Sequence, residues 1–419
     1  MVMSTEQRTG WNNVLQRLDL SKAVTPKFIP KHPRHRWYWF PHSFSPELVE
    51  EILQHWGLPQ GAHLLDPFVG SGTTTLAAKQ YGLQPTGFDI SPLAVLISRA
   101  KTEDYNVRQL YEAKLQILDL ADRAASSDLV DPSLYEKSPQ LKKAFVFNEF
   151  RALGSIRKAI SSKAFGISRL FFTTALLSTL KVFSRGVASG GWLKWVEKEE
   201  ASAEEILQEF DRRVENMIGD LEQSPLPHCR ANIREFDPLS RKMPTSFFDA
   251  VITSPPYPNK HDYTRVFHVE LAFLGKTEAE IKVLRKRMLR SHVEGKLIPK
   301  SKNFKVPSRL LESIKQIDGL VDRRLPKMLL GYFEDLYLLM ENLKFATKPG
   351  APVALVVGNV RYAGVDIFVD ELLVEVAEQS GFTHEETWIA RFRGNSAQQM
   401  ARYGRTPMRE SIVFLRNSN

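Results

Sequence analysis

Residues 247–257, with the sequence FFDAVITSPPY, decide how the rest of this chain is interpreted. Their apolar, β-branched run predicts a buried strand, and the two prolines predict a stiff loop after it. Because Pro255 and Pro256 lack N–H groups and fix their own φ, the loop presents carbonyls at Ser254 and Pro255 but few donors. Such acceptors suit an amine, and Tyr257 is placed to stack on a flat ring. A proline-rich ligand or a simple turn is the alternative interpretation.

A second motif, HLLDPFVGSGTTT at residues 63–75, predicts a strand, a glycine loop and the start of a helix. Gly70 and Gly72 allow close approach of a ligand to the backbone, and Thr73 lies where a helix N-terminus presents free N–H groups. No Gly-Lys-Ser/Thr follows, which excludes a phosphate loop, and Thr75 replaces the third glycine of a dinucleotide fingerprint. The motif therefore indicates a nucleotide-type site of another kind.

Together the two motifs resemble those of the DNA amino-methyltransferases, which methylate cytosine N4 or adenine N6 with S-adenosylmethionine. GFDISPLA at residues 87–94 and RANIREFDP at 230–238 resemble further motifs of that family. Asp89 follows a predicted strand, where an acidic residue can bind ribose hydroxyls. The resemblance implies a catalytic loop of Ser254, Pro255, Pro256 and Tyr257, and a cofactor site of Asp66, Pro67, Phe68, Gly70, Gly72, Thr73, Asp89, Ile90, Phe236 and Asp237.

The resemblance implies direct methyl transfer to a base flipped out of the duplex, without a metal. A serine at the first position of the catalytic motif is typical of cytosine-N4 enzymes. The cofactor loop precedes the catalytic loop, however, the reverse of many cytosine-N4 enzymes, so adenine N6 stays open. Cys229 is the single cysteine and lies outside the SPPY loop, which excludes carbon-5 methylation through a cysteine nucleophile. An RNA or protein amine methyltransferase, or a non-catalytic nucleic-acid-binding protein, is a weaker alternative.

Composition places the chain among soluble globular proteins, with 43% hydrophobic and 25% charged residues. No stretch approaches roughly 18 uninterrupted apolar residues, the length of a membrane span, and the N-terminus lacks a secretory leader. We therefore expect no membrane contact and a cytoplasmic location, associated with a prokaryotic nucleoid. The net charge of +9 favours a polyanionic partner. The resemblance implies that this partner is double-stranded DNA, with a cognate restriction endonuclease as a possible second partner.

Strands alternate with helices over most of the chain, which predicts a doubly wound α/β sheet with an antiparallel terminal hairpin. The resemblance makes this a class I methyltransferase, Rossmann-like fold. Helical periodicity predicts an all-helical insertion in the middle of the chain. The predicted segments are an N-terminal arm at 1–30, catalytic core parts at 31–100, 226–275 and 326–419, a helical insertion at 101–225 and a basic insertion at 276–325.

Residues 276–305 contain ten Lys and Arg and three Glu, which predicts contacts with DNA phosphates or, alternatively, a solvated helix face. Basic and aromatic residues interleave at 31–40, where a core anchor is favoured over nucleic-acid binding. The arginine-rich connection at 391–409 is a further surface that could reach DNA. The predicted DNA-contacting residues are Asp262, Tyr263, Arg285, Lys286, Arg287 and Arg290.

Overall fold

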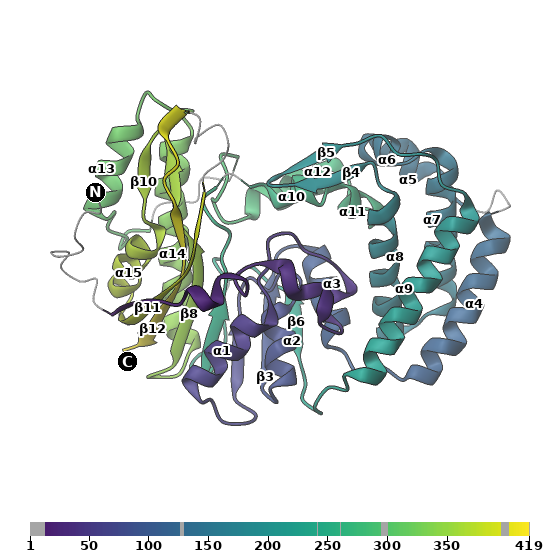
Figure 1. The fold of residues 1–419 in the computed structure, drawn as a ribbon, viewed down its shortest axis with the longest axis horizontal. Coiled ribbons are helices and arrows are strands. Elements are labelled where there is room, and N and C mark those ends of the chain that lie inside the picture. The colour runs from purple at the N-terminus through teal and green to yellow at the C-terminus, as the bar shows by residue number, and fades with distance from the viewer. Residues whose placement is uncertain are drawn as a thin grey trace.

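The computed structural model describes residues 13–125, 130–240, 242–259, 261–294, 301–394 and 402–418. Its main sheet has eight strands in the order β1-β11-β12-β8-β7-β2-β3-β6 (Figure 1). β12 pairs antiparallel with β11 and with β8, and the other neighbours are parallel. The strands are β1 (Val14–Gln16), β2 (His63–Asp66), β3 (Gln84–Asp89), β6 (Asn232–Glu235), β7 (Ala250–Thr253), β8 (Pro352–Gly358), β11 (Phe382–Arg393) and β12 (Met408–Asn417). The prediction of an α/β sheet with a terminal antiparallel hairpin is confirmed.

The centre of the sheet is apolar because helices cover both of its faces. Every residue of β7 and of β8 is buried, as expected for strands without a solvent face. Side chains alternate along β8, so that Val353, Leu355 and Val357 pack under α14 and α15. Ala354 and Val356 pack on the other side, in the cluster of α1 and α2. The buried strand β7 thus fixes the start of the predicted catalytic loop.

The helices beside the sheet begin with capping signals that the sequence carries. Pro46 occupies the first turn of α1, and Ser91 caps α3 by accepting from Ala94 N. Helices that pack on the sheet are α1 (Pro46–Trp56), α2 (Thr73–Gln80), α3 (Pro92–Thr102), α14 (Leu325–Ala346) and α15 (Val369–Gln379). The shorter ones near the site are α10 (Tyr263–Val266), α11 (His268–Phe273), α12 (Glu278–Arg287) and α13 (Ser308–Ile317).

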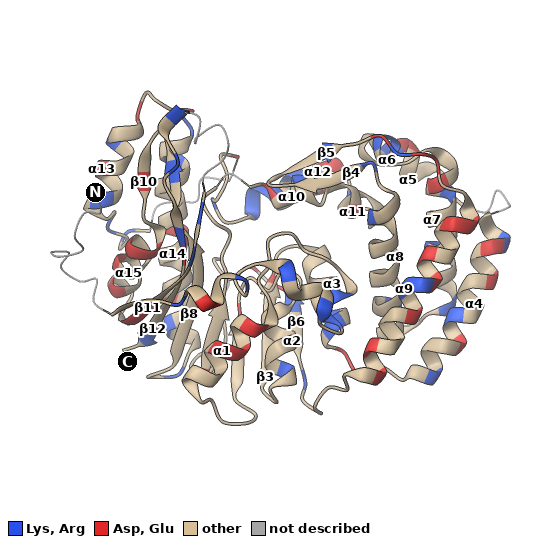
Figure 2. Ribbon diagram, in the orientation of Figure 1, with Lys and Arg blue, Asp and Glu red and all other residues tan. Residues whose placement is uncertain are grey.

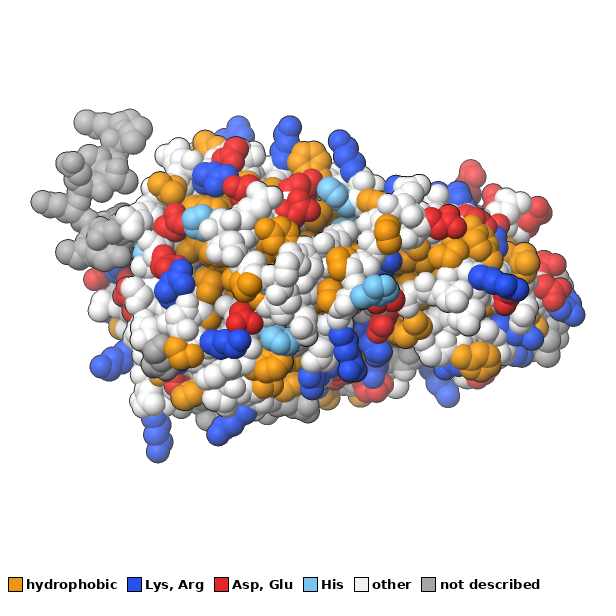
Figure 3. All heavy atoms as spheres, turned by 90° about the horizontal axis from the view of Figure 1, so that it is seen from below, with side chains coloured by type: hydrophobic (Ala, Val, Ile, Leu, Met, Phe, Trp, Pro, Cys, Tyr) orange, Lys and Arg blue, Asp and Glu red, His pale blue; other side chains and the backbone are white. Residues whose placement is uncertain are grey.

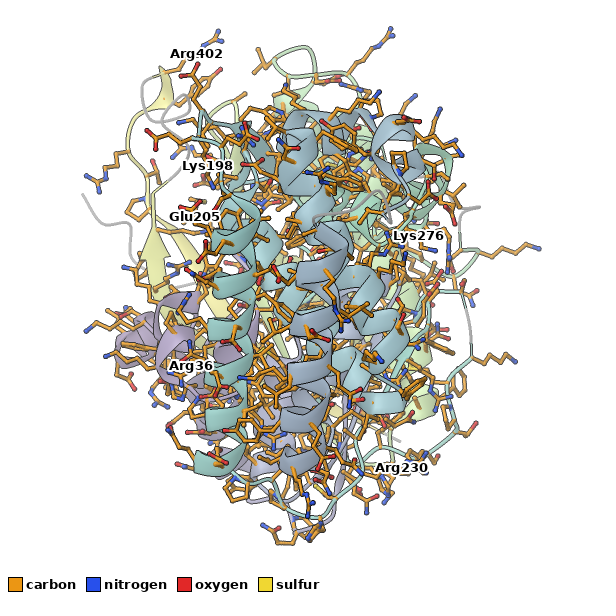
Figure 4. All side chains as sticks on the ribbon, turned by 90° about the vertical axis from the view of Figure 1, so that its right-hand side faces the viewer. Arg36, Lys198, Glu205, Arg230, Lys276 and Arg402 are labelled. Carbon is orange, nitrogen blue, oxygen red and sulfur yellow. The ribbon has the colours of Figure 1, made fainter. Side chains whose placement is uncertain are left out.

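A helical unit stands to one side of the sheet and is viewed from outside in Figure 4, with Arg36 beside it. It contains α4 (Val107–Ala125), α5 (Ser133–Lys137), α6 (Pro139–Ala144), α7 (Phe147–Lys163), α8 (Gly166–Phe183) and α9 (Ala203–Gln223). α8 is long and apolar enough to span a membrane, but it packs between α3, α7 and α9 as a core helix. The expectation that this insertion is all helical is wrong, because β4 (Gly186–Ser189) and β5 (Trp192–Trp195) form an antiparallel hairpin within it.

Further differences concern the N-terminal segment and the residues that follow β8. The described part of the predicted arm, residues 13–30, is not separate from the core, because β1 adds a parallel strand to β11 and the 3₁₀ turns Leu18–Ser21 and Pro26–Lys31 follow it. The other residues of the arm, 1–12, lie outside the described residues. A small hairpin of β9 (Val360–Tyr362) and β10 (Val365–Ile367) follows β8. Part of the basic insertion, at 295–300, and part of the arginine-rich connection, at 395–401, lie outside the described residues.

Candidate active site

A pocket opens where β2, β3, β6 and β7 end, which is where open α/β sheets bind ligands. Each of these strands delivers a residue of a predicted motif at or just beyond its carboxyl end. The structure therefore brings together segments that are far apart in the sequence. Predicted residues in the pocket lining are Asp66, Pro67, Phe68, Gly70, Thr73, Asp89, Ile90, Asp237, Ser254 and Pro256.

Four residues that were predicted for the catalytic loop or the cofactor site do not line this pocket: Gly72, Phe236, Pro255 and Tyr257. Gly72 has φ +84°, and a Cβ there would lie 2.5 Å from Ser98 Oγ, so glycine is needed for the loop to pack against α3. The Phe236 ring packs on Phe88, with 4.5 Å between ring centroids. Phe236 therefore has a contact within the protein, and its place in the cofactor site stays a prediction.

Two carboxylates face the pocket, the buried Asp66 from β2 and the half-buried Asp89 from β3. Asp66 accepts hydrogen bonds from Thr253 Oγ1 at 2.7 Å and from Phe68 N at 3.1 Å. Asp89 accepts from Gly70 N at 3.0 Å and Ser91 N at 2.9 Å, which ties the glycine loop to β3. Burial raises the pKa of each carboxyl to about 6, since desolvation disfavours the charged form more than these donors favour it.

The predicted catalytic loop, residues 254–257, is hydrogen-bonded to β8 and to strand β12 of the terminal hairpin. Ser254 Oγ donates to Val356 O at 3.1 Å, and Tyr257 Oη donates to Glu410 Oε1 at 2.8 Å. Glu410 is also paired with Arg391, at 2.5 Å. Burial raises the pKa of the Tyr257 hydroxyl well above its usual value, so this hydroxyl stays protonated and donates. The ring is thereby fixed at its outer end.

Gly358, at the end of β8, gives the Tyr257 ring its space. A Cβ at this position would lie 2.8 Å from Tyr257 Cε2, closer than real contacts allow. Neither Gly358 nor Glu410 belongs to a motif, and both are far from Tyr257 in the sequence. Only the pairing of β8 with β7 and β12 brings them to the loop. Sequence reasoning missed them because it had no signal of that pairing.

Aromatic residues that the motifs do not include form other walls of the pocket. Phe40 and Phe267 both line it, and their rings pack at 4.4 Å. The interpretation of residues 31–40 as a core anchor agrees with the burial of Trp37 and Tyr38. Phe40 belongs to the same aromatic run, which was the one feature of the sequence that could have indicated its place in the pocket wall.

The β4–β5 hairpin reaches the pocket from the helical unit. His42, a lining residue, donates from Nε2 to Gly190 O at 3.1 Å. A Cβ on Gly191 would lie 2.2 Å from His261 Cδ2, so only glycine permits this close contact. The two histidine rings themselves pack at 4.9 Å. The helical unit and the sheet therefore meet at these histidines, beside the pocket.

Three of the predicted DNA contacts are corrected by burial and pairing. Asp262 is buried, caps α10 through Thr264 N at 2.9 Å, and pairs with Arg285 at 2.6 Å. Arg290 is 4% exposed and pairs with Glu334 at 2.9 Å and Asp335 at 2.6 Å. These groups hold the protein together, and their charges are not free for phosphates.

The remaining residues of that set divide between the pocket and the surface. Tyr263 lines the pocket and packs against the His42 ring, with 5.3 Å between the ring centroids, and its contact with DNA stays a prediction. Lys286 and Arg287 are exposed on α12. Arg287 also lines the pocket, with Leu284. The basic helix therefore forms a wall of the pocket as well as a surface.

Comparison with known proteins identifies the family. A family model described as DNA methylase matches residues 10–99. The Type II methyltransferase M.BsoBI of Geobacillus stearothermophilus is 31% identical in an alignment 437 positions long, which covers 91% of this chain and 85% of the relative. The chain belongs to the DNA amino-methyltransferase family.

Other relatives of the methyltransferase agree over most of their length. The Type II methyltransferase M.AvaI of Nostoc sp. is 28% identical, with 94% of this chain and 89% of the relative covered. M.MvaI of Kocuria varians is 22% identical, with 92% of each chain covered. An S-adenosylmethionine-dependent methyltransferase structure from Methanosarcina mazei aligns with 87% of this chain and 96% of its own, at 9% identity and a TM-score of 0.30.

S-adenosylmethionine is the methyl donor of this family, and the hydrogen-bond acceptors of the pocket fit this cofactor. This cofactor carries two cationic groups, ribose hydroxyls and a base amine, all of which interact favourably with carboxylates. Asp66 and Asp237, which are buried, and Asp89, which is half-buried, supply three carboxylates in a pocket whose other walls are largely apolar. Gly70, at φ +49°, keeps the loop beside the pocket free of a side chain.

Proposed function

We propose that this methyltransferase transfers a methyl group from S-adenosylmethionine to the exocyclic amine of a base flipped out of duplex DNA, with cytosine N4 as the favoured target. One observation carries the proposal. The pocket that contains Asp66, Asp89 and Asp237 also contains Ser254 and Pro256, so the cofactor site and the amine-accepting loop share one space. Orientation of two reactants in such a space supplies much of the rate of a transfer reaction.

Each part of the site has a proposed task in this reaction. Bound S-adenosylmethionine supplies an electrophilic methyl group. Asp89 accepts hydrogen bonds from ribose hydroxyls, Asp237 accepts from the base amine of the cofactor, and Asp66 faces its methionine end. The carbonyls of Ser254 and Pro255 accept the protons of the target amine, which turns the nitrogen lone pair toward the cofactor. Tyr257 stacks on the target base.

Cytosine N4 is favoured because serine stands first in the catalytic motif, at Ser254. Adenine N6 is the second candidate, because the cofactor loop of this chain precedes its catalytic loop. Both amines are conjugated with a ring and both suit the same pair of carbonyl acceptors. The residues of the loop therefore favour an amine as the target more strongly than they favour one base.

The proposal is tested by producing the methyltransferase in a host that lacks other DNA methylases. Single-molecule sequencing of the host DNA would locate the modified sites, and digestion to nucleosides would identify the base. N4-methylcytosine at one recurring sequence is the expected result. N6-methyladenine would replace the favoured base with the second candidate. Methylation of RNA alone, or of no nucleic acid, would overturn the proposal.

The raised pKa values of Asp66 and Asp89 predict how cofactor affinity depends on pH. Both carboxyls have a pKa of about 6, so they gain protons as the pH falls through 6 and can then no longer attract the cationic cofactor. Affinity is therefore expected to be full above about pH 7 and to fall below pH 6 by up to about tenfold per unit for each carboxyl. Titration calorimetry with S-adenosylmethionine from pH 5 to 8 measures this.

The variant Asp89→Asn provides the control for that prediction. It should bind the cofactor about 10- to 150-fold more weakly at pH 8, because hydrogen bonds to a charged acceptor contribute about 1.5 to 3 kcal/mol. It should also show a shallower pH dependence, since Asp66 alone still titrates. Circular dichroism at each pH verifies that the fold is intact. An affinity of the unmodified protein that stays constant from pH 5 to 8 would remove both carboxylates from the cofactor site.

The DNA surface is proposed to include the exposed side of α12. Figure 2 shows Lys and Arg on this helix, whereas the face in Figure 3, viewed from below, mixes basic and acidic side chains without a field of one sign. Lys282 and Lys286 are exposed on α12. They replace the buried Arg290 as candidates for phosphate contacts.

Replacing Lys282 and Lys286 by glutamine is expected to weaken DNA binding alike for all sequences, because phosphate contacts position without specifying. Each lost contact should lower the log-log salt slope of binding by about 0.9. Fluorescence anisotropy with labelled duplexes at several salt concentrations measures the slope. The matched control replaces Lys137 and Lys163, exposed on the far helical unit, and should leave it unchanged. An unchanged slope in the α12 variant would make this helix a solvated face.

A restriction endonuclease with the same recognition sequence is the second proposed partner, because the relatives above are named Type II methyltransferases. DNA from the producing host is then expected to resist cleavage at the methylated site. Digestion with an endonuclease of that specificity, once the site is mapped, checks this.

A further inference from the structure

Arg393, at the end of β11, brings a cationic side chain to the catalytic loop. Its guanidinium carbon lies over the Tyr257 ring, 5.5 Å from the centroid. Its Nη2 donates to Asn359 O at 3.4 Å and packs so closely on Gly358 that a Cβ there would lie 2.6 Å away. Arg393 belongs to none of the motifs and is absent from the pocket lining.

Two other arginines of the terminal hairpin form ion pairs with carboxylates, whereas Arg393 forms none with a described residue. Arg391 pairs with Glu410 at 2.5 Å, and Arg409 pairs with Asp370 at 2.6 Å. Within the described part of the chain, no Asp or Glu lies within ion-pair distance of Arg393, and its Nη2 donates to a backbone carbonyl. A half-buried guanidinium without a counter-ion is costly unless a ligand supplies the negative charge.

The titratable rings beside Arg393 are neutral at pH 7, so Arg393 carries the positive charge at this place. Burial lowers the pKa of His261 to about 4, and the pKa of His42 is also lowered by burial, so both imidazoles are neutral at pH 7. The positive charge of Arg393 lowers both further, which places it near both rings. Tyr257 is likewise neutral. One cation therefore stands among neutral rings where the pocket, the catalytic loop and the hairpin meet.

We propose that Arg393 binds the backbone phosphate next to the flipped nucleotide and so holds the target base over Tyr257. This inference rests on the proposed function. A base stacked on Tyr257 has its own phosphate within a nucleotide's reach, and a guanidinium beside that ring matches the planar, two-donor geometry that phosphate favours. Arg393 is thus a binding residue for the substrate backbone, separate from the carbonyls that hold the amine.

The test uses short duplexes that carry the mapped recognition site. In one series, a single charged phosphate flanking the target nucleotide is replaced by a neutral methylphosphonate. For the unmodified protein, one such replacement is expected to lower kcat/KM by about 10- to 100-fold, the effect of losing a hydrogen bond to a charged group. Arg393→Gln should cause a similar loss on the normal duplex and unchanged affinity for S-adenosylmethionine.

The decisive measurement combines the two changes. If Arg393 contacts that phosphate, the methylphosphonate should have almost no further effect in Arg393→Gln, because the interaction is already lost. Arg393→Lys keeps the charge and should restore part of the activity, which a purely packing role would not. Arg416→Gln, at the far end of the same hairpin and paired with Glu385, is the matched control and should behave as the unmodified protein.

Additive losses in the combined experiment would overturn the assignment. So would a wild-type protein for which no flanking methylphosphonate matters, an outcome that does not depend on whether any variant folds. Failure of the proposed function is recognised separately, because the unmodified protein would then not methylate the normal duplex. If the protein methylates DNA but the losses are additive, only the role proposed for Arg393 is overturned.

Discussion

Replacing Tyr257 by alanine is expected to reduce methylation of duplex DNA by about 5- to 150-fold while leaving affinity for S-adenosylmethionine unchanged. The range follows from the roughly 1 to 3 kcal/mol that stacking on one base contributes. Tyr257 lies outside the lining of the pocket that contains the three carboxylates, which is why cofactor binding should be spared. Methylation kinetics and calorimetry on the same preparation measure the two quantities.

Tyr257→Phe separates the ring from the hydroxyl. This variant keeps the stacking surface and loses only the hydrogen bond to Glu410, so it should retain most of the activity. A loss equal to that of Tyr257→Ala would mean that the tie to Glu410, and not the ring face, is what the reaction needs. Full activity of Tyr257→Ala on duplex DNA would exclude stacking on this residue altogether.

The parts of the site that follow strands in the sequence could be predicted, because a parallel sheet gathers the carboxyl ends of its strands at one edge. Asp66, Asp89, Asp237 and Ser254 each lie at or just after the end of a strand, and all four line the pocket. Glu410 could not be found in this way. It becomes a partner of Tyr257 only through the antiparallel pairing of β12 with β8, which no local pattern announces.

Charge patterns were less informative than strand patterns, for a physical reason. A run of Lys and Arg has the same composition whether its side chains face solvent or carboxylates on another element. α14 carries Glu334 and Asp335 into the space below residue 290, and this turns one arginine of the basic run into a buried partner. Gly190 and Gly191 form the tip of a hairpin that reaches His42 and His261, a contact between distant segments that no local pattern indicates.

Arg290→Gln is expected to destabilise the protein by about 3 to 5 kcal/mol, because removal of one partner leaves buried charges uncompensated. Asp335 is fully buried and would keep neither of the hydrogen bonds that it now accepts from the guanidinium, at 2.6 Å and 3.0 Å. Gly331 packs against the same side chain. A Cβ at Gly331 would lie 2.7 Å from Arg290 Cδ, so the space around the arginine is tightly filled. Denaturant unfolding followed by tryptophan fluorescence measures the loss.

The matched control is Arg324→Gln, which breaks an ion pair with Asp322 that is exposed on both sides. Exposed pairs contribute about 0 to 1 kcal/mol, so this variant should unfold almost as the unmodified protein does. The salt slope of DNA binding provides the opposing test. If Arg290→Gln kept its stability but lowered that slope by about 0.9, the guanidinium would be reaching a phosphate in the complex, and the buried pair would have to open when DNA binds.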